Sequence, residues 1–461
     1  MDYLSKGKLA NPKLTLYAFQ LKHKLAQEPK INVKNADHLW LKCQQIGQQL
    51  SIPKLEILPP LIEKATKEKT DIIGEILPER ILTFTAIEHK NNLHLRGEVN
   101  PLQINDTYAL DLTLGFPKSK VKITDLKRLN KDNCLLPDNI NASLGQTLVF
   151  FAKPLEKFEN EESLHSFADA CVKALISEEK FQELQVYRQD KGKLLGSPIF
   201  EYNNKAYSPQ QQCHILIWLN INPQTAKLEE SGEYYYPLIN LLLCRSRIIY
   251  ARHQAMHYNQ QAREEYSELE SKINEFSGIP NQDLNSCFDK FQKWLKSTPD
   301  KSFKYARYIT YLQLHRTTIR TDIRNYKLYI DKINKLYSGD DLQFLSLFLK
   351  LTYNTYIQQI TTDLEYLIPG QKLFENMIET IRGIVEIEEV KRDRSLERTV
   401  QVVATALGGG AIVSGVVAEH IKEPINPPNS KYPLHPITTS LIWSFIATII
   451  FYIVARLWWR K

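Results

Sequence analysis

The stretch that decides the predicted fold lies near the end of the chain and has the sequence Leu441-Ile442-Trp443-Ser444-Phe445-Ile446-Ala447-Thr448-Ile449-Ile450-Phe451-Tyr452-Ile453-Val454. It belongs to a segment without charge, residues 438–455, whose length matches a hydrocarbon layer of ~30 Å. Trp458 and Trp459 are followed by Arg460 and Lys461, the residue types that anchor a helix at a membrane surface. We therefore predict a transmembrane helix over residues 438–455.

A second uncharged segment, residues 399–418, precedes it. This segment is rich in Gly and Ala, so a buried helix is the alternative to a membrane span. Charge asymmetry favours the span, because basic residues lie before the first segment and after the second: Lys391, Arg392, Arg394, Arg398, Arg456, Arg460 and Lys461. The positive-inside rule then predicts a two-pass hairpin over residues 399–461, with both chain ends in the cytoplasm and the hairpin in the plasma (inner) membrane.

Residues 236–398 have a helical pattern, and we expect them to form a long stalk. Breaks are expected at residues 278–280, near Pro299, at Gly339 and at residues 369–370. A coiled-coil-like seam recurs at steps of four and three through Ile319, Ile323, Tyr326, Ile330, Ile333 and Tyr337. The rods on either side of residues 369–370 are predicted to run antiparallel, and the last one to continue into the first membrane segment.

The N-terminal part has a mixed pattern, for which we predict an α/β sandwich with one lobe over residues 1–155 and a second over 156–235. Residues 93–99 and 108–114 alternate apolar and polar side chains, which indicates a hairpin joined through Asn105 and Asp106. Residues 147–151 and 214–219 have the composition of buried strands. Helices are expected at residues 37–50, 59–67 and 164–176.

Composition and motifs exclude several classes of protein. The six cysteines are scattered without a C-x-x-C pair, which is typical of reduced thiols. The 59 basic and 52 acidic residues are too evenly balanced to indicate a nucleic-acid partner. None of the phosphate-binding, dinucleotide, zinc-protease or serine-hydrolase motifs occurs, so we expect neither an enzyme nor a cofactor.

The order of a cytosolic α/β region, a long stalk helix, two membrane helices and a basic C-terminus resembles the CorA-type magnesium transporter superfamily. The resemblance covers residues 301–461 and implies a homo-oligomer, pentameric in that family, whose first membrane helices line a pore. The family's Gly-Met-Asn signature is missing, since the matching stretch is Val416-Val417-Ala418-Glu419-His420-Ile421. CorA-like effectors of bacterial defence systems share the same outline.

Two groups of residues are candidate sites for a small ion or an anionic ligand. If the first membrane helix lines a pore, its lining includes Thr405, Gly408, Gly409, Gly410, Ser414, Glu419 and His420; helix packing and a solvated loop are the alternatives. Further upstream, a basic row at helical spacing fits an anionic ligand or lipid head group, or else a solvated face: Arg316, Arg320, Arg324 and Lys327.

His253 and His257 lie four residues apart and form a weak candidate metal site, with a plain surface as the alternative. The function expected from all these features is an oligomeric membrane channel or transporter, whose cytosolic region senses an ion or ligand and controls the pore. The alternative is a membrane-anchored interaction or scaffold protein, or a defence-type effector, that conducts no ions. The lipid bilayer and further copies of the chain are the expected partners.

Overall fold

The computed structural model describes residues 3–23, 33–68, 74–88, 93–279, 287–420 and 436–458. Within these ranges, side chains are described except at residues 67–68, 86–88, 93, 406–407, 409–420, 436–440 and 458. The chain divides into two units. The first comprises Met1–Tyr266 with Lys304–Gly370, and the second comprises Ser267–Phe303 with Gln371–Lys461.

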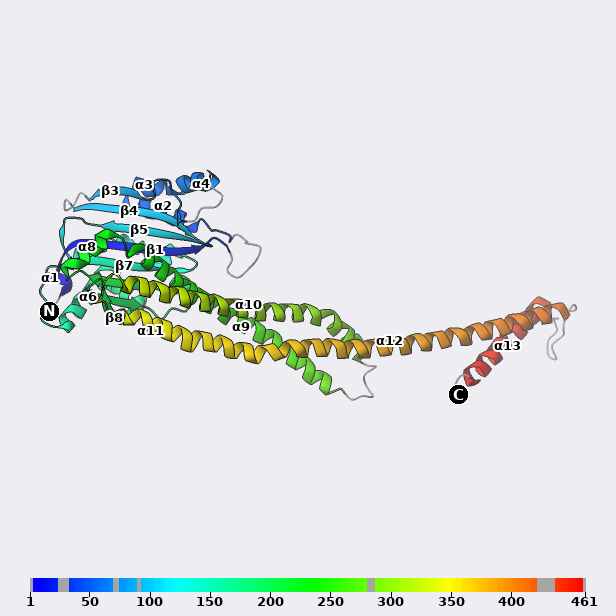
Figure 1. The fold of residues 1–461 in the computed structure, drawn as a ribbon. Helices are drawn as coiled ribbons and strands as arrows, with labels where there is room; N and C mark the ends of the chain where they lie inside the picture. Colours follow the sequence, from blue (N-terminus) through cyan, green and yellow to red (C-terminus); the bar gives the residue numbers. More distant parts are fainter. Residues whose placement is uncertain are drawn as a thin grey trace. The chain divides into compact units, whose positions relative to one another are not determined.

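A single ten-stranded sheet organises the first unit (Figure 1). The strand order is β2-β4-β5-β1-β7-β10-β9-β8, with β3 paired to β4 and β6 paired to β1. Every pairing is antiparallel except that of β7 with β10. The strands are β1 (Lys8–Leu21), β2 (Gly74–Glu75), β3 (Leu82–Glu88), β4 (Leu93–Ile104), β5 (Thr107–Gly115), β6 (Lys120–Lys122), β7 (Gly145–Pro154), β8 (Tyr187–Leu194), β9 (Ser197–Asn203) and β10 (His214–Leu219).

One face of this sheet is apolar. Side chains alternate between the two faces of a strand, and Leu14, Leu16, Leu112, Phe150 and Ile217 all point into one buried core. Short helices of the same unit complete that core, with Trp40, Ile62 and Phe167 among their contributions. These helices are α1 (Tyr3–Lys6), α2 (His38–Leu50), α3 (Pro53–Glu56), α4 (Leu58–Glu68), α5 (Pro137–Ile140), α6 (Glu161–Ile176) and α7 (Glu178–Glu183). A further short helix, α8 (Pro223–Ser231), pairs through Glu229 with Lys13 of β1.

The structure confirms the expected strands and helices of the N-terminal part. The alternating segments form the hairpin β4–β5 through Asn105 and Asp106, and the two buried strands are β7 and β10. The three expected helices are α2, α4 and α6. The segments expected to form separate lobes share one sheet, because β7 pairs with β1 on one side and with β10 on the other.

Long helices follow the sheet in sequence. They are α9 (Tyr235–Ser277), α10 (Phe288–Asn334), α11 (Gln343–Leu351), α12 (Gln358–His420) and α13 (Pro436–Trp458), and a π-helical turn (Thr352–Ile357) joins α11 to α12. The expected breaks near Pro299 and at residues 369–370 are wrong, since α10 and α12 run through them. The rods around Pro369 are therefore not antiparallel.

Local packing stabilises α12 around Pro369, a residue type that removes a helical hydrogen bond. The Tyr305 hydroxyl donates to the Leu367 carbonyl at 2.6 Å. At Gly370, a Cβ would lie 2.4 Å from the Tyr305 hydroxyl and 2.7 Å from the ring of Tyr266. Both tyrosines thus occupy space that only glycine leaves free, and they pack directly on this part of the helix.

The predicted transmembrane hairpin requires correction. In the part of the chain that the structure describes, no helix combines the length and the apolar character needed to cross a bilayer. This finding overturns the two-pass hairpin of residues 399–418 and 438–455, together with the inner-membrane location deduced from it. Residues 421–435, between the two predicted membrane segments, lie outside the described residues.

Candidate functional site

A row of polar residues crosses the other face of the sheet, opposite the apolar core. The strand registers place Asn100 beside Asp111, Asp111 beside Tyr17, Tyr17 beside Thr147, and Thr147 beside His214. Glu201 extends the row through a hydrogen bond to His214. All six side chains are at most 8% exposed. We call these six residues the polar row; it is notable because buried ionisable groups are costly unless they are paired.

At one end of the row, a histidine lies between a hydroxyl and a carboxylate. His214 Nε2 lies 3.0 Å from Glu201 Oε1, and His214 Nδ1 lies 2.8 Å from Thr147 Oγ1. Arg245 of α9 approaches the same carboxylate, with Nη2 at 3.8 Å from Oε1. The guanidinium also lies 5.2 Å from the ring centre of Phe348 in α11. Glu201 therefore connects the sheet to two helices.

Burial sets the protonation of this cluster. Burial, with the charge of Arg245 nearby, lowers the pKa of His214 to about 4, so the imidazole is neutral at pH 7. Burial alone would raise the pKa of Glu201, but the hydrogen bond from His214 and the charge of Arg245 outweigh it and hold this pKa below the ordinary value. The neutral imidazole then donates from Nε2 to Glu201 and accepts from the Thr147 hydroxyl at Nδ1.

The hydroxyl, imidazole and carboxylate follow the order found in nucleophilic catalysis. Thr147 and His214 are only 1% and 3% exposed, however, so the Thr147 hydroxyl is buried and does not face solvent. The arrangement can instead hold α9 and α11 in one position on the sheet.

A second ionic contact links the sheet to the helices. Arg247 of α9 donates from Nε to Asp322 of α10 at 3.1 Å, and from Nη1 to Asp106 in the β4–β5 turn. Burial raises the pKa of Asp322, although Arg247 opposes this effect. Further along α9, the guanidinium of Arg252 lies 4.0 Å from the ring centre of Tyr356 in the π-helical turn. Successive arginines of α9 thus contact the β4–β5 turn, α10, α11 and the π-helical turn.

At the other end of the row, Asp111 lies beneath the start of α9. The hydroxyl of Tyr235 accepts from Asn100 Nδ2 at 3.2 Å and donates to the Asp111 carboxyl. Thr113, two residues along β5, is a further hydrogen-bond partner of this carboxyl. Burial raises the pKa of Asp111 to about 7. A carboxyl with this pKa changes its charge near neutral pH.

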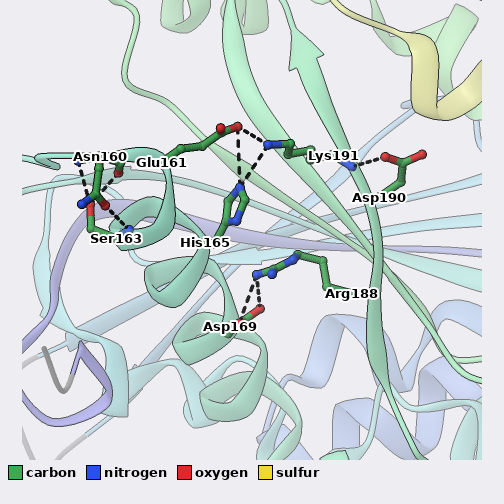
Figure 2. A network of polar contacts seen from close by, with 8 residues as sticks. All are labelled: Asn160, Glu161, Ser163, His165, Asp169, Arg188, Asp190 and Lys191. Carbon is green, nitrogen blue, oxygen red and sulfur yellow. Dashed lines mark hydrogen bonds and ion pairs between the residues drawn. The ribbon is translucent and has the colours of Figure 1, made fainter.

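Between β8, at the end of the strand order, and α6, the surface carries a polar network of a different kind (Figure 2). Figure 2 shows Glu161, His165 and Asp169 along α6, facing Arg188 and Lys191 of β8. Arg188 Nη1 lies 3.1 Å from both carboxylate oxygens of Asp169, and Lys191 pairs with Glu161. Water competes for such exposed pairs, so each adds little stability. This network is a useful comparison for the buried clusters.

The basic row predicted from the sequence lies on α10. Arg320, Arg324 and Lys327 are exposed, Arg316 is half-buried, and none of the four forms an ion pair within the described part of the chain. An anionic ligand there stays a prediction. His253 is half-buried and His257 exposed on α9, and the described residues contain no group of three or more His, Cys, Asp or Glu side chains that could hold a metal.

Most of the predicted pore-lining residues have no described side chains. Thr405 is exposed on α12, where its hydroxyl donates to the Gln401 carbonyl at 2.8 Å, and a Cβ at Gly408 would meet open space. For the other predicted positions the structure describes the backbone alone: Gly409, Gly410, Ser414, Glu419 and His420. A pore lining therefore gains no support from these positions.

Comparison with known proteins yields no match to a protein-family model, a curated protein or a solved structure. The resemblance to CorA-type transporters therefore stays a prediction. The polar row was not predicted from the sequence, because its six members lie on six separate strands. The only local signal was the polar residues at alternate positions of strands expected to be half-buried, such as Asp111 and Thr113 in β5.

Proposed function

We propose that this chain is a non-catalytic interaction protein that self-associates through the helices of its second unit, while the first unit regulates it. The observation that carries this proposal is the surface of α13. Over residues 441–457 its large apolar side chains are 39–69% exposed, with Phe445 the most exposed of them. Contiguous apolar surface of this kind on a folded protein marks a binding site.

A second exposed apolar stripe supports a helical partner. On α12, Leu396, Val400 and Val403 are 64%, 58% and 43% exposed. They recur at steps of four and three, the spacing by which one helix packs on another. A second copy of the chain offers an identical stripe, and identical surfaces form closed, symmetric interfaces. Another copy is therefore the simplest partner that covers both surfaces.

The regulatory role of the first unit rests on its buried ionic contacts. Hydrophobic packing alone would hold helices on a sheet, whereas paired buried charges favour one specific arrangement of them. The helices α9, α10 and α12 each have residues in both units. A change in how the first unit holds them is therefore passed along continuous backbone to the second.

Light scattering of the full chain, purified without detergent, tests the proposal over a dilution series. We expect the mass of a multimer for the unchanged chain and the mass of one chain for the double variant Val400→Asp with Phe445→Asp. Tyr207→Asp is the matched control, since Tyr207 is 74% exposed in the first unit, and it should remain multimeric.

Two results would overturn the proposal. The first is a monomer at every concentration. The second is a monomer that sediments with phospholipid vesicles and loses that property in the double variant, because the apolar surface would then bind lipid instead of a second copy.

A further inference from the structure

Two buried oxygen atoms in the polar row have no hydrogen-bond partner among the described residues: Asp111 Oδ1 and Asn100 Oδ1. The strand register places Asp111 directly beside Asn100. Both atoms are acceptors when Asp111 is ionised, and leaving a buried acceptor without a donor costs ~1–3 kcal/mol. A single proton placed on Asp111 supplies the missing donor for both atoms.

The surroundings leave few other donors. Tyr235 and Thr113 already bond the Asp111 carboxyl, and Asn100 Nδ2 is committed to the Tyr235 hydroxyl. Lys13, four residues before Tyr17 on β1, is bound to Glu229 of α8, with its Nζ at 2.8 Å and 2.9 Å from the two carboxylate oxygens.

The remaining titratable groups around Asp111 are Glu98 from β4, Tyr17 from β1, and Tyr234 and Tyr235 from the start of α9. The pKa values of the three tyrosines are raised, so they are neutral at pH 7, and the charge of Glu98 disfavours a second negative charge on Asp111. An ionised Asp111 would therefore be a buried negative charge that Glu98 opposes. Ionisation is disfavoured as long as the start of α9 covers this site.

We propose that Asp111 is a proton latch: its protonated carboxyl donates from Oδ1 to Asn100 Oδ1 and holds the start of α9 on the sheet, and loss of the proton releases that segment. Release exposes the carboxylate to water, which removes the cost of the buried charge. The latch is a property of the first unit and stands whether or not the chain self-associates.

The expected pH range follows from the change of environment. The pKa of Asp111 is about 7 when covered, and an exposed aspartate titrates near ~3.9. Between these values the covered form holds one more proton than the open form. The ratio of covered to open molecules then falls about tenfold for each rise of one pH unit, and levels off above pH ~7.

Hydrogen exchange of the full chain, measured by mass spectrometry between pH 5 and pH 8, tests the latch. We expect the protection factors of amides near Leu238 and Leu242 in α9 to fall about tenfold per pH unit up to pH ~7, after correction for the intrinsic exchange rate. Asp111→Asn, whose amide can donate permanently to Asn100, should abolish this slope. Asp190→Asn is the control, since Asp190 is half-buried on β8, outside the polar row, and accepts from the Lys191 amide; it should keep the slope.

A second variant covers the case in which Asp111→Asn does not fold. Tyr235→Phe removes a donor that favours the ionised Asp111 carboxyl. The levelling-off point, which is the pH above which the protection factors stop falling, should therefore move to higher pH. Flat protection in the unchanged chain, a slope that survives Asp111→Asn, or an unmoved levelling-off point in Tyr235→Phe would each overturn the latch.

Discussion

Replacing Glu201 by glutamine should strongly destabilise the first unit. The substitution keeps the shape of the side chain, and its amide oxygen can still accept from His214 Nε2. It removes the charge, however, and leaves the guanidinium of Arg245, itself 5% exposed, without its carboxylate. Arg245 Nε already lacks a hydrogen-bond partner among the described residues, so the guanidinium has little other compensation.

Breaking a buried ion pair by removing one partner costs ~3–5 kcal/mol, because it leaves an uncompensated charge. We expect a loss of ~3 kcal/mol, the lower end of this range, because the His214 hydrogen bond survives and the ring of Phe348 still faces the cation. The double variant Glu201→Gln with Arg245→Met removes the stranded charge as well. It should recover at least half of the loss.

Hydrogen exchange of the amides in β9 and β10, followed through a urea series, measures the free energy of opening of this part of the sheet. Glu161→Gln is the matched control, because Glu161 also pairs with a basic residue but lies on the surface (Figure 2); it should leave the urea profile unchanged. Equal effects of the two glutamine variants, or no recovery in the double variant, would refute the reasoning.

Two further predictions concern stability. Burial lowers the pKa of His315 to about 4. Between pH ~4 and ~6.5, the unfolded chain therefore binds a proton at His315 that the folded chain does not bind. The contribution of the neutral imidazole to the free energy of unfolding is present above pH ~6.5 and is lost on acidification. His315→Phe should make the slope of unfolding free energy against pH more negative by ~1.4 kcal/mol per pH unit in urea titrations at pH 5 and 6. Asp111 contributes a slope of the opposite sign to that of His315, and it does so equally in both proteins. In the β8–β9 turn, Gly196→Ala should cost ~2–3 kcal/mol, because φ is +81° and a Cβ would lie 2.5 Å from Asn222 Nδ2. Gly232→Ala, with φ at +72° but open space around it, should cost ~1 kcal/mol, and similar urea midpoints for the two variants would contradict the steric argument.

Local patterns were enough to find most of the elements. The alternation in residues 93–99 and 108–114 identified β4 and β5, and the Asn105-Asp106 pair identified the turn, since Asn105 adopts a positive φ of 54° there. The seam on α10 was also found, with Ile319, Tyr326 and Ile333 fully buried. These features depend on neighbours along the chain, which a sequence displays directly.

Features that depend on distant residues were not predictable in the same way. Pro369 was expected to end a helix, whereas α12 continues through it, and the side chains that pack on this part of α12 are Tyr266 and Tyr305, more than sixty positions earlier. At Gly339 the sequence predicts a break between helices and nothing of its contacts. In the structure the adjacent Asp340 accepts hydrogen bonds from the amides of Leu195 and Gly196 in the β8–β9 turn.

The polar row explains why the long helices need more than an apolar stripe to settle on the sheet. The apolar face, with Leu16 and Leu112, accepts helices by shape and burial alone, and small shifts of a helix cost little there. On the opposite face, a shift of α9 along the sheet separates Arg245 from Glu201, Arg247 from Asp106, and Tyr235 from Asp111. Each separation strands a buried charge or polar group, so the helix has one favoured position and a steep cost for leaving it. If α9 is held this way, Glu201→Gln should increase hydrogen exchange in α9 as well as in β9 and β10, whereas a purely apolar interface would confine the change to the strands.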